Sequence, residues 1–362
     1  MTDKLSRMTV SQSWPSVLQK LLAKNDLSRA EAAWVMTEIM SGEASEAQVG
    51  AFMMALRSKG ESVDELAGLV DVMLQHAVLL NTGSDAVDIV GTGGDLAGTV
   101  NVSSMSAILC AAAGIPVMKH GSRSASGKTG SSEMLEVLGI RLDLSPEAVA
   151  DVFREVGLTF FFAPVFHPAM RHVAPVRKAL GVPTTFNFLG PLANPAQPIA
   201  TSLGVSNEFI APLMASEIAA RGRTALVFRG SDGLDELTTT GTSRIWQVSG
   251  GAVAEFELEP ASLGLPRASV SDLIGGDAHH NAKVARVVLG SDEWDASLSA
   301  VRDIVLLNAA GGVVAYRLAK DSSQASRDLH ERFAEALELV HSALDSGAAA
   351  EKLSAWIAAT QA

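Results

Sequence analysis

The spacing of hydrophobic residues changes character close to residue 83. Before that point apolar side chains recur every three or four positions, as in Trp34, Val35 and Ile39, which is the period of an amphipathic helix. Three capping boxes mark helix starts: Ser28–Glu31, Ser45–Gln48 and Ser62–Glu65. Residues 1–82 are therefore predicted to form a small all-helical domain. Its Met-rich stretch at 52–54 is expected to be core or a helix–helix interface.

Beyond residue 83 short β-like runs alternate with helical runs. Strands are predicted at 87–90, 115–118, 159–162 and 225–228, with a hairpin over 243–258. Helices are predicted at about 103–113, 131–138, from 146 onward, at 167–180, and over most of the chain after 281. This alternation is typical of an α/β fold whose mostly parallel central sheet is covered by helices. Residues 83–362 are therefore predicted to be a larger α/β domain.

Composition narrows the class of protein. Of 362 residues, 48% are apolar and 19% charged, and the formal net charge of −12 argues against a nucleic-acid or anionic-membrane partner. The single cysteine, Cys110, excludes an intramolecular disulfide and lies in an apolar run, which indicates an inert core thiol. The N-terminus has no signal-peptide pattern, and apolar runs stay shorter than the roughly 18 residues of a membrane span. A cytoplasmic location is expected.

The first candidate site is GTGGD at residues 91–95, between a predicted strand and a predicted helix. Glycine lets backbone N–H groups approach an anion closely, and the following helix N-terminus favours negative charge. The loop is not the dinucleotide fingerprint G-x-G-x-x-G, because Leu96 occupies the place of the last glycine. A ligand-free glycine-rich turn is the alternative interpretation.

A second polar loop, KHGSRSASGKTGSS, covers residues 119–132. Lys119, Arg123 and Lys128 supply positive charge, and His120 is placed where it could contact a substrate. The loop is not a Walker A motif, because five residues rather than four separate Gly121 from Gly127. A solvated basic turn is the alternative. Two anion-binding loops within about fifty residues favour a ligand with more than one phosphate.

Asp235 and Glu236 stand side by side in DGLDELTTTGT, shortly after a predicted strand. Adjacent carboxylates suit Mg²⁺, which takes few protein ligands and completes its shell with water and phosphate oxygens. A charged turn is the alternative. His279 and His280 indicate the start of a surface helix rather than a metal site, and no Ser-His-Asp or Cys-His arrangement is evident.

Together these segments resemble the anthranilate phosphoribosyltransferase family. The resemblance rests on VGTGGD, NVSS, KHGSRSAS, GSSEMLEVLG, FAPVFHPAMRHVAPVRKALGVPT, FNFLGPLANPA, DGLDELTTTGT and GGDAHHNA, which occur in the family's order and spacing. It covers nearly the whole chain. It implies a small helical domain made of residues 1–82 and, joined to them in space, part of about 170–195. This domain is hinged to the α/β domain, and the protein is expected to be a homodimer. The implied reaction transfers the phosphoribosyl group of 5-phosphoribosyl 1-pyrophosphate (PRPP) to anthranilate, a step of tryptophan biosynthesis, with Mg²⁺ as cofactor and two ions expected per subunit.

The resemblance also assigns residues to the site. The residues implied for PRPP are Gly91, Gly94, Asp95, Thr99, Asn101, Val102, Ser103, Ser104, Lys119, His120, Gly121, Arg123 and Ser131. Gly91, Ser122 and Arg177 would contact anthranilate, and Ser103, Asp235 and Glu236 would hold Mg²⁺. Such a reaction needs positioning and leaving-group stabilisation rather than a covalent nucleophile, so the lack of a catalytic triad is expected.

The chain departs from the family pattern at four positions. Leu96 replaces a glycine, Gly98 an asparagine, and Gly127 a serine, and Ser122 stands where an asparagine normally contacts anthranilate. A phosphoribosyltransferase with a different aromatic acceptor is therefore one alternative function. A pyrimidine nucleoside phosphorylase of the same architecture is another, although the Asp235–Glu236 pair argues against it. A non-catalytic relative that binds nucleic acid or a regulatory ligand is the third.

Overall fold

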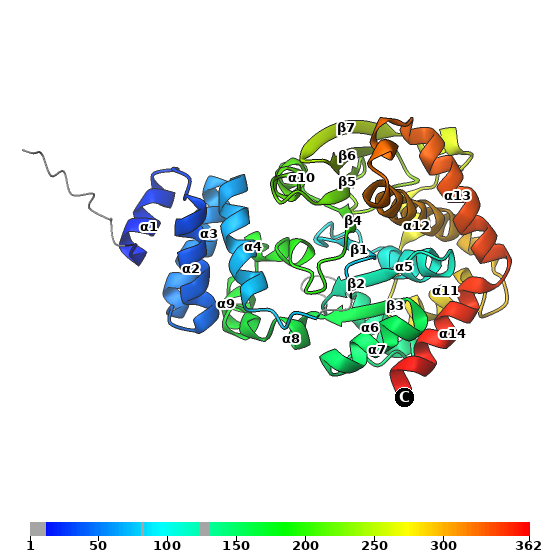
Figure 1. Ribbon diagram of the computed structural model, residues 1–362, viewed down its shortest axis with the longest axis horizontal. Helices are drawn as coiled ribbons and strands as arrows, with labels where there is room; N and C mark the ends of the chain where they lie inside the picture. The colour runs from blue at the N-terminus through cyan, green and yellow to red at the C-terminus, as the bar shows by residue number, and fades with distance from the viewer. Residues whose placement is uncertain (1–11, 81–82, 124–129) are drawn as a thin grey trace, which may run out of the picture.

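A computed structural model describes residues 12–80, 83–123 and 130–362 of the chain. It has two parts, a small helical domain and a larger α/β domain, and helix α4 of the first faces helix α10 of the second (Figure 1). The predicted fold class is confirmed. Gly127 and Lys128 of the second loop lie outside the described residues.

Four helices open the helical domain: α1 (Trp14–Leu22), α2 (Arg29–Ser41), α3 (Glu46–Lys59) and α4 (Val63–Gln75). All three predicted capping boxes are present with both of their hydrogen bonds, which satisfies N–H groups that the helix itself leaves without a partner. Phe52 and Met53 are fully buried, so the Met-rich stretch is core, while Met54 is 38% exposed.

A second segment of the chain completes this domain. It contains α8 (Ala163–Phe166), α9 (Ala174–Leu180) and the 3-10 turns η1 (Pro168–His172), η2 (Thr185–Asn187) and η3 (Gly190–Leu192). Val173, Val176, Phe186 and Leu189 pack into the same core as α1 to α4. The continuous helix predicted at 167–180 was wrong: the chain forms η1 and then α9, because prolines near the start of each lack the N–H that a continuous helix requires.

Seven strands form one sheet in the order β3-β2-β1-β4-β5-β6-β7. They are β1 (Val87–Gly91), β2 (Val117–Gly121), β3 (Leu158–Phe162), β4 (Ala200–Gly204), β5 (Thr224–Gly230), β6 (Ser243–Ser249) and β7 (Ala252–Leu258). The pairs among β1 to β5 are parallel, and β6 and β7 form the predicted antiparallel hairpin. Strand order reverses between β1 and β4, and the carboxyl end of a parallel sheet at such a switch point is where ligands bind.

Helices cover both faces of the sheet. They are α5 (Val102–Ala112), α6 (Ser131–Leu138), α7 (Pro146–Val156), α10 (Ile210–Ala220), α11 (Ala278–Val288), α12 (Ser299–Lys320), α13 (Leu329–Asp345) and α14 (Ala348–Gln361), with 3-10 turns η4 (Pro260–Leu263), η5 (Val270–Leu273), η6 (Ala296–Leu298) and η7 (Ser322–Ser326). α5 and α12 share the largest core with the sheet, whereas α10 packs on β5 and β6 in a separate cluster. Cys110 on α5 is buried, and burial raises the pKa of its thiol, in agreement with an inert core thiol.

One described helix is apolar and long enough to cross a membrane. It covers residues 296–320 and includes α12, and 72% of its most apolar window is buried inside the protein. Gly312 on this helix packs against the central strand, where an added Cβ would lie 2.6 Å from Cδ1 of Ile89. The apolar character of α12 is thus explained by its place in the core.

Candidate active site

A cavity of about 880 Å³ lies between the two domains, at the carboxyl ends of β1 and β2. Its walls come from the loop after β1, the end of β2, the start of α6, the Asp235–Glu236 loop and the segment 274–281. The helical domain and its second segment contribute Met73, His167, Met170, Arg171 and Arg177. The cavity therefore occupies the sheet's switch point and is closed on one side by the helical domain.

The GTGGD loop lies against the acidic loop. The backbone N–H of Gly93 donates to Oδ2 of Asp235 at 2.7 Å. Gly93 and Gly94 have φ of +66° and +84°, which glycine adopts without strain. Leu96 also has a positive φ, +59°, and its side chain is 78% exposed. A left-handed conformation costs a non-glycine residue about 1 kcal/mol, so replacing the family's glycine here strains the loop.

The second loop begins later than predicted. Lys119 and His120 belong to β2, which pairs with β3 as far as Gly121 and Phe162. Lys119 is 2% exposed, and its Nζ donates to the carbonyl oxygen of Ile89 at 2.5 Å and to Oγ of Ser103 at 3.1 Å. Burial lowers the pKa of Lys119, which the nearby carboxylates of Asp88, Glu236 and Asp235 oppose. Its ammonium group is therefore fixed at the base of the site instead of moving in a solvated loop.

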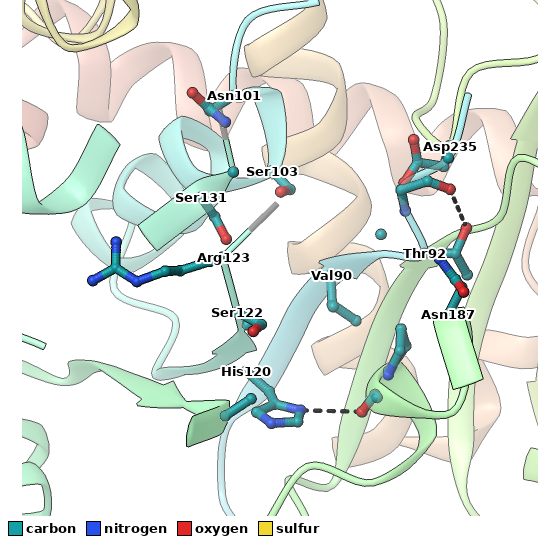
Figure 2. Close-up of a pocket in the computed structure, with 18 of the residues that line it drawn as sticks. Val90, Thr92, Asn101, Ser103, His120, Ser122, Arg123, Ser131, Asn187 and Asp235 are labelled. Atoms are coloured by element: carbon teal, nitrogen blue, oxygen red, sulfur yellow. Dashed lines mark hydrogen bonds between the residues drawn. The ribbon is translucent and has the colours of Figure 1, made fainter. Parts of the chain in front are cut away.

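His120 contributes a neutral imidazole. Nδ1 of His120 lies 3.0 Å from the carbonyl oxygen of Gly190 (Figure 2), and a carbonyl only accepts, so Nδ1 is the protonated nitrogen. Burial lowers the pKa of His120 to about 3, and the ring of His167 lies 5.1 Å away, centroid to centroid. Nε2 of His120 has no hydrogen-bond partner among the described residues. His120 therefore stays neutral and can accept a hydrogen bond through Nε2.

Asp235 is buried and its neighbour Glu236 is partly buried. The pKa of Asp235 is raised to about 7. Burial is the main cause, and the charge of the nearby Asp95 carboxylate adds to it. Burial and the charge of Asp235 raise the pKa of Glu236 well above its usual value, while Lys119 counteracts this effect. Two adjacent carboxylates with little access to water are costly unless a cation neutralises them. The described residues contain no group of three or more His, Cys, Asp or Glu side chains arranged for a metal. Two carboxylates and a serine hydroxyl nevertheless suit Mg²⁺ that takes its other ligands from phosphate and water.

Nearly all the residues implied for the site line this one cavity. They are Gly91, Gly94, Asp95, Thr99, Asn101, Val102, Ser103, Lys119, His120, Gly121, Ser122, Arg123, Ser131, Arg177, Asp235 and Glu236. Ser104 does not line it: the side chain is 1% exposed on the core side of α5, and its Oγ has no partner among the described residues. Any contact from Ser104 to a ligand in the cavity must therefore come from its backbone.

Arg123 lies at the cavity but is engaged elsewhere. Its guanidinium donates twice to Glu136 on α6, at 2.8 and 2.9 Å, and lies 5.6 Å from the ring centre of Phe162. In Figure 2 the side chain extends away from Asp235. Arg177, by contrast, is partly buried in the cavity wall, and desolvation lowers its pKa. Arg177 is thus the better placed of the two to meet an anionic group inside the cavity.

Several cavity residues were not singled out from the sequence. His167, Met170 and Arg171 lie in the segment between β3 and β4, and Gly275, Gly276 and Asn281 lie in GGDAHHNA. Both segments supported the resemblance, but only Arg177 of the first received a role and no residue of GGDAHHNA did. The run of polar residues and glycines in GGDAHHNA was the available signal.

Comparison with known proteins agrees with this geometry. Residues 83–350 match the model of the glycosyl transferase family a/b domain, and residues 15–77 match its helical bundle domain. Fold and site thus define a two-domain glycosyltransferase. Anthranilate phosphoribosyltransferase of Leifsonia xyli subsp. xyli is 53% identical over 354 residues, which are 98% of this chain and 100% of that protein.

Solved structures give the same result. Anthranilate phosphoribosyltransferase from Thermus thermophilus aligns with a TM-score of 0.84 and 38% identity, covering 96% of this chain and 99% of that one. The enzyme from Saccharomyces cerevisiae in complex with PRPP and Mg aligns with a TM-score of 0.84 and 27% identity, covering 96% and 98%. The chain belongs to the anthranilate phosphoribosyltransferase family.

Proposed function

We propose that this protein transfers the phosphoribosyl group of PRPP to anthranilate, giving N-(5-phosphoribosyl)anthranilate and pyrophosphate, in tryptophan biosynthesis. The observation that supports this most directly is the contact of the GTGGD loop with Asp235 at the sheet's switch point, where Gly93 N–H donates to the carboxylate. Backbone N–H groups suited to phosphate and carboxylates suited to Mg²⁺ thereby face one cavity. A relative that is 53% identical over its whole length is an anthranilate phosphoribosyltransferase, which supports the same reaction.

The donor half of the cavity would bind PRPP. The glycine loop and the start of α5 offer backbone N–H groups to the pyrophosphate, and Lys119 adds a fixed positive charge. Ser103, Asp235 and Glu236 would hold Mg²⁺, with two ions per subunit as the proposed number. Bound Mg²⁺ would supply neutralisation of the charge that develops on the pyrophosphate leaving group.

The acceptor half would bind anthranilate between Ser122 and Arg177, with Gly91 at the boundary of the two halves. Arg177 would pair with the aromatic carboxylate, which directs the amine toward the anomeric carbon. The amine nitrogen then bonds to that carbon as the bond to pyrophosphate breaks, and the nitrogen passes its proton to the departing pyrophosphate or to water. The residues act by positioning the reactants and stabilising the leaving group.

We further propose a homodimer in the cytoplasm, without a nucleic-acid or membrane partner. The net charge of −12 and the burial of the one long apolar helix among the described residues argue against nucleic-acid and membrane partners, and the dimer is proposed from the family resemblance. Size-exclusion chromatography with light scattering tests the dimer. A single monomer mass at micromolar concentration would contradict it.

The decisive experiment supplies PRPP, Mg²⁺ and a panel of aromatic amines and acids. Turnover of anthranilate with release of pyrophosphate is expected. Turnover of another acceptor in its place would favour a phosphoribosyltransferase with a different aromatic acceptor. Release of base from a pyrimidine nucleoside and phosphate, without anthranilate turnover, would identify a nucleoside phosphorylase. Calorimetry that shows no Mg²⁺-dependent PRPP binding would indicate a non-catalytic relative.

A further inference from the structure

The segment GGDAHHNA (275–282) lies along the loop that follows β1. Ile274, just before it, forms an antiparallel bridge with Thr99, and the N–H of Gly275 donates to the carbonyl oxygen of Gly98 at 2.8 Å. The N–H of Val100 donates to the carbonyl oxygen of Leu273 at 3.0 Å. Residues 273–276 therefore run beside residues 98–100 in a fixed register.

Within this segment the orientation of the Asn281 amide is determined by its neighbours. The backbone N–H of Gly276 donates to Oδ1 of Asn281 at 2.8 Å. An N–H group can only donate, so the atom that it meets must be the amide oxygen. The other end of the amide, Nδ2, donates to Oδ1 of Asn101 at 2.9 Å. Asn281 is 2% exposed and close-packed: an added Cβ on Gly275 would lie 2.8 Å from its Oδ1.

This second hydrogen bond determines the orientation of Asn101 in turn. Asn101 is the N-cap residue of α5, a place where an asparagine oxygen usually accepts an N–H of its own helix. No such bond forms here, because the oxygen accepts from Asn281. The Nδ2 of Asn101 consequently points toward the cavity side where Ser103 and Ser131 lie (Figure 2).

We propose that Asn281 is a positioning residue that fixes the polarity of the Asn101 amide, so that Asn101 presents an N–H donor to a phosphate group of PRPP. This inference rests on the proposed function. Phosphate oxygens only accept hydrogen bonds, so a reversed Asn101 amide would set oxygen against oxygen. The backbone of Gly276 thereby determines, through Asn281, which end of the Asn101 side chain faces the ligand.

The test begins with the wild-type protein, PRPP, Mg²⁺ and anthranilate. If the wild type does not turn over, the proposed function fails before any variant is made. Given turnover, Asn281→Ala should raise the KM for PRPP by about 10-fold or more, the range for losing a hydrogen bond to a charged group, while the KM for anthranilate stays within about twofold. An unchanged KM for PRPP would overturn the proposal.

Asn281→Asp distinguishes an effect on the orientation of the Asn101 amide from simple support of segment 275–282. An aspartate still accepts from the N–H of Gly276. If Asn281 only held segment 275–282 in place, the Asp variant would therefore keep the wild-type KM for PRPP. Under the proposal it has no N–H for Asn101, whose amide must reverse, and the KM for PRPP should rise at least as much as in Asn281→Ala. In an Asn101→Ala background, Asn281→Ala should not raise the KM for PRPP further. Asn281→Asp in the same background measures how much the added negative charge alone raises that KM. Additive effects of 101 and 281 would overturn the proposal.

Asp277→Ala is the matched control for loosening this region. Asp277 caps α11 by accepting from the N–H of His280 at 2.8 Å and leaves the Asn281 amide untouched. It should lower the Tm while leaving the KM for PRPP within about twofold. If Asp277→Ala raised the KM for PRPP as much as Asn281→Ala does, Asn281 would have only a structural role and the proposal would be wrong.

Discussion

An added Cβ on Gly91 would lie 2.2 Å from Oδ2 of Asp235, so the end of the central strand and the acidic loop meet without room for a side chain. Gly204, at the end of the neighbouring β4, is closed in the same way, with its added Cβ 1.7 Å from the backbone oxygen of Asp235. Glycine at both strand ends is therefore a requirement of the site. It sets the distance between the phosphate loop and the proposed metal-binding carboxylates.

Gly91→Ala should lower kcat/KM by more than about 100-fold, because the methyl group must displace the Asp235 carboxylate. Steady-state kinetics over a Mg²⁺ titration measure this loss together with a higher requirement for the ion. Gly50→Ala is the control: its Cβ would meet only Cγ1 of Val176, at 3.6 Å, inside α3. That variant should keep its activity and be as stable or up to about 1 kcal/mol more stable. Near-wild-type activity of Gly91→Ala would contradict the close approach.

Replacing both carboxylates, Asp235→Asn with Glu236→Gln, should abolish turnover and leave the protein folded. Amides match the carboxylates in shape but do not neutralise a divalent cation, so the loss should exceed about 100-fold. Circular dichroism establishes that the variant is folded, and calorimetry with PRPP, with and without Mg²⁺, measures binding. Retained Mg²⁺-dependent activity would place the metal at other residues.

The buried Asp88 predicts a pH dependence of stability. Burial raises its pKa to about 6, against the partial compensation of Lys119 and Asn194. Because the folded state holds this proton more tightly than the unfolded state, the stability contributed by Asp88 falls as pH rises from about 4 to about 6 and is constant above that range. The difference in free energy of unfolding between wild type and Asp88→Asn should therefore shrink over that range, by about 3 kcal/mol at most.

Urea denaturation at pH 4, 5, 6 and 7 measures this difference. Asp88→Asn also loses part of a hydrogen-bond network, since the aspartate accepts from the N–H of His120 at 3.1 Å and from Nδ2 of Asn194 at 2.8 Å. That loss is a constant offset and does not change the slope. A difference that stays the same at all four pH values would show that Asp88 does not titrate as proposed.

Ser122→Asn should narrow the acceptor half. Ser122 lines the cavity where the family has an asparagine, and the larger amide restores a hydrogen-bonding group. A gained hydrogen bond of about 0.5–1.5 kcal/mol predicts a KM for anthranilate that is about two- to tenfold lower. Ring-substituted anthranilates should lose activity relative to anthranilate, because the amide fills space. A proportional change for all acceptors would show that Ser122 does not set acceptor choice.

Arg221 should be the main electrostatic contact between the two domains. As the C-cap residue of α10, it pairs with buried Glu217. It also reaches Asp71 on α4 at 2.9 Å and the carbonyl oxygen of Ala67 at 3.0 Å. Arg221→Ala leaves Glu217 buried without its cation, which should cost about 3–5 kcal/mol. Arg154→Ala, which removes the exposed Arg154–Asp151 pair, should cost less than about 1 kcal/mol. Denaturation of both variants at pH 7 tests the contrast, and equal losses would contradict it.

Much of the fold was predictable because its signals are local. A capping box satisfies N–H groups within four residues, and a glycine such as Gly139 ends a helix through its own left-handed backbone. Strand β4 (Ala200–Gly204) was missed, because its run ATSLG has little strand character of its own and is held between β1 and β5. The prediction began strand β2 two residues too early and ended it before Lys119. A charged lysine by itself indicates a loop, and only the structure shows that its Nζ donates a buried hydrogen bond to Ile89.

The candidate site divides in the same way. The sequence by itself determined the two polar loops and the Asp235–Glu236 pair, since each follows a strand and shows its chemistry in adjacent residues. Only the tertiary structure decided that Ser104 faces the core, that Arg123 pairs with Glu136, and which end of Asn101 faces the cavity. That last choice depends on Asn281, 180 residues away. A hydrogen bond is directional over a few ångströms, and local sequence patterns do not specify which distant groups the packed fold brings within that range.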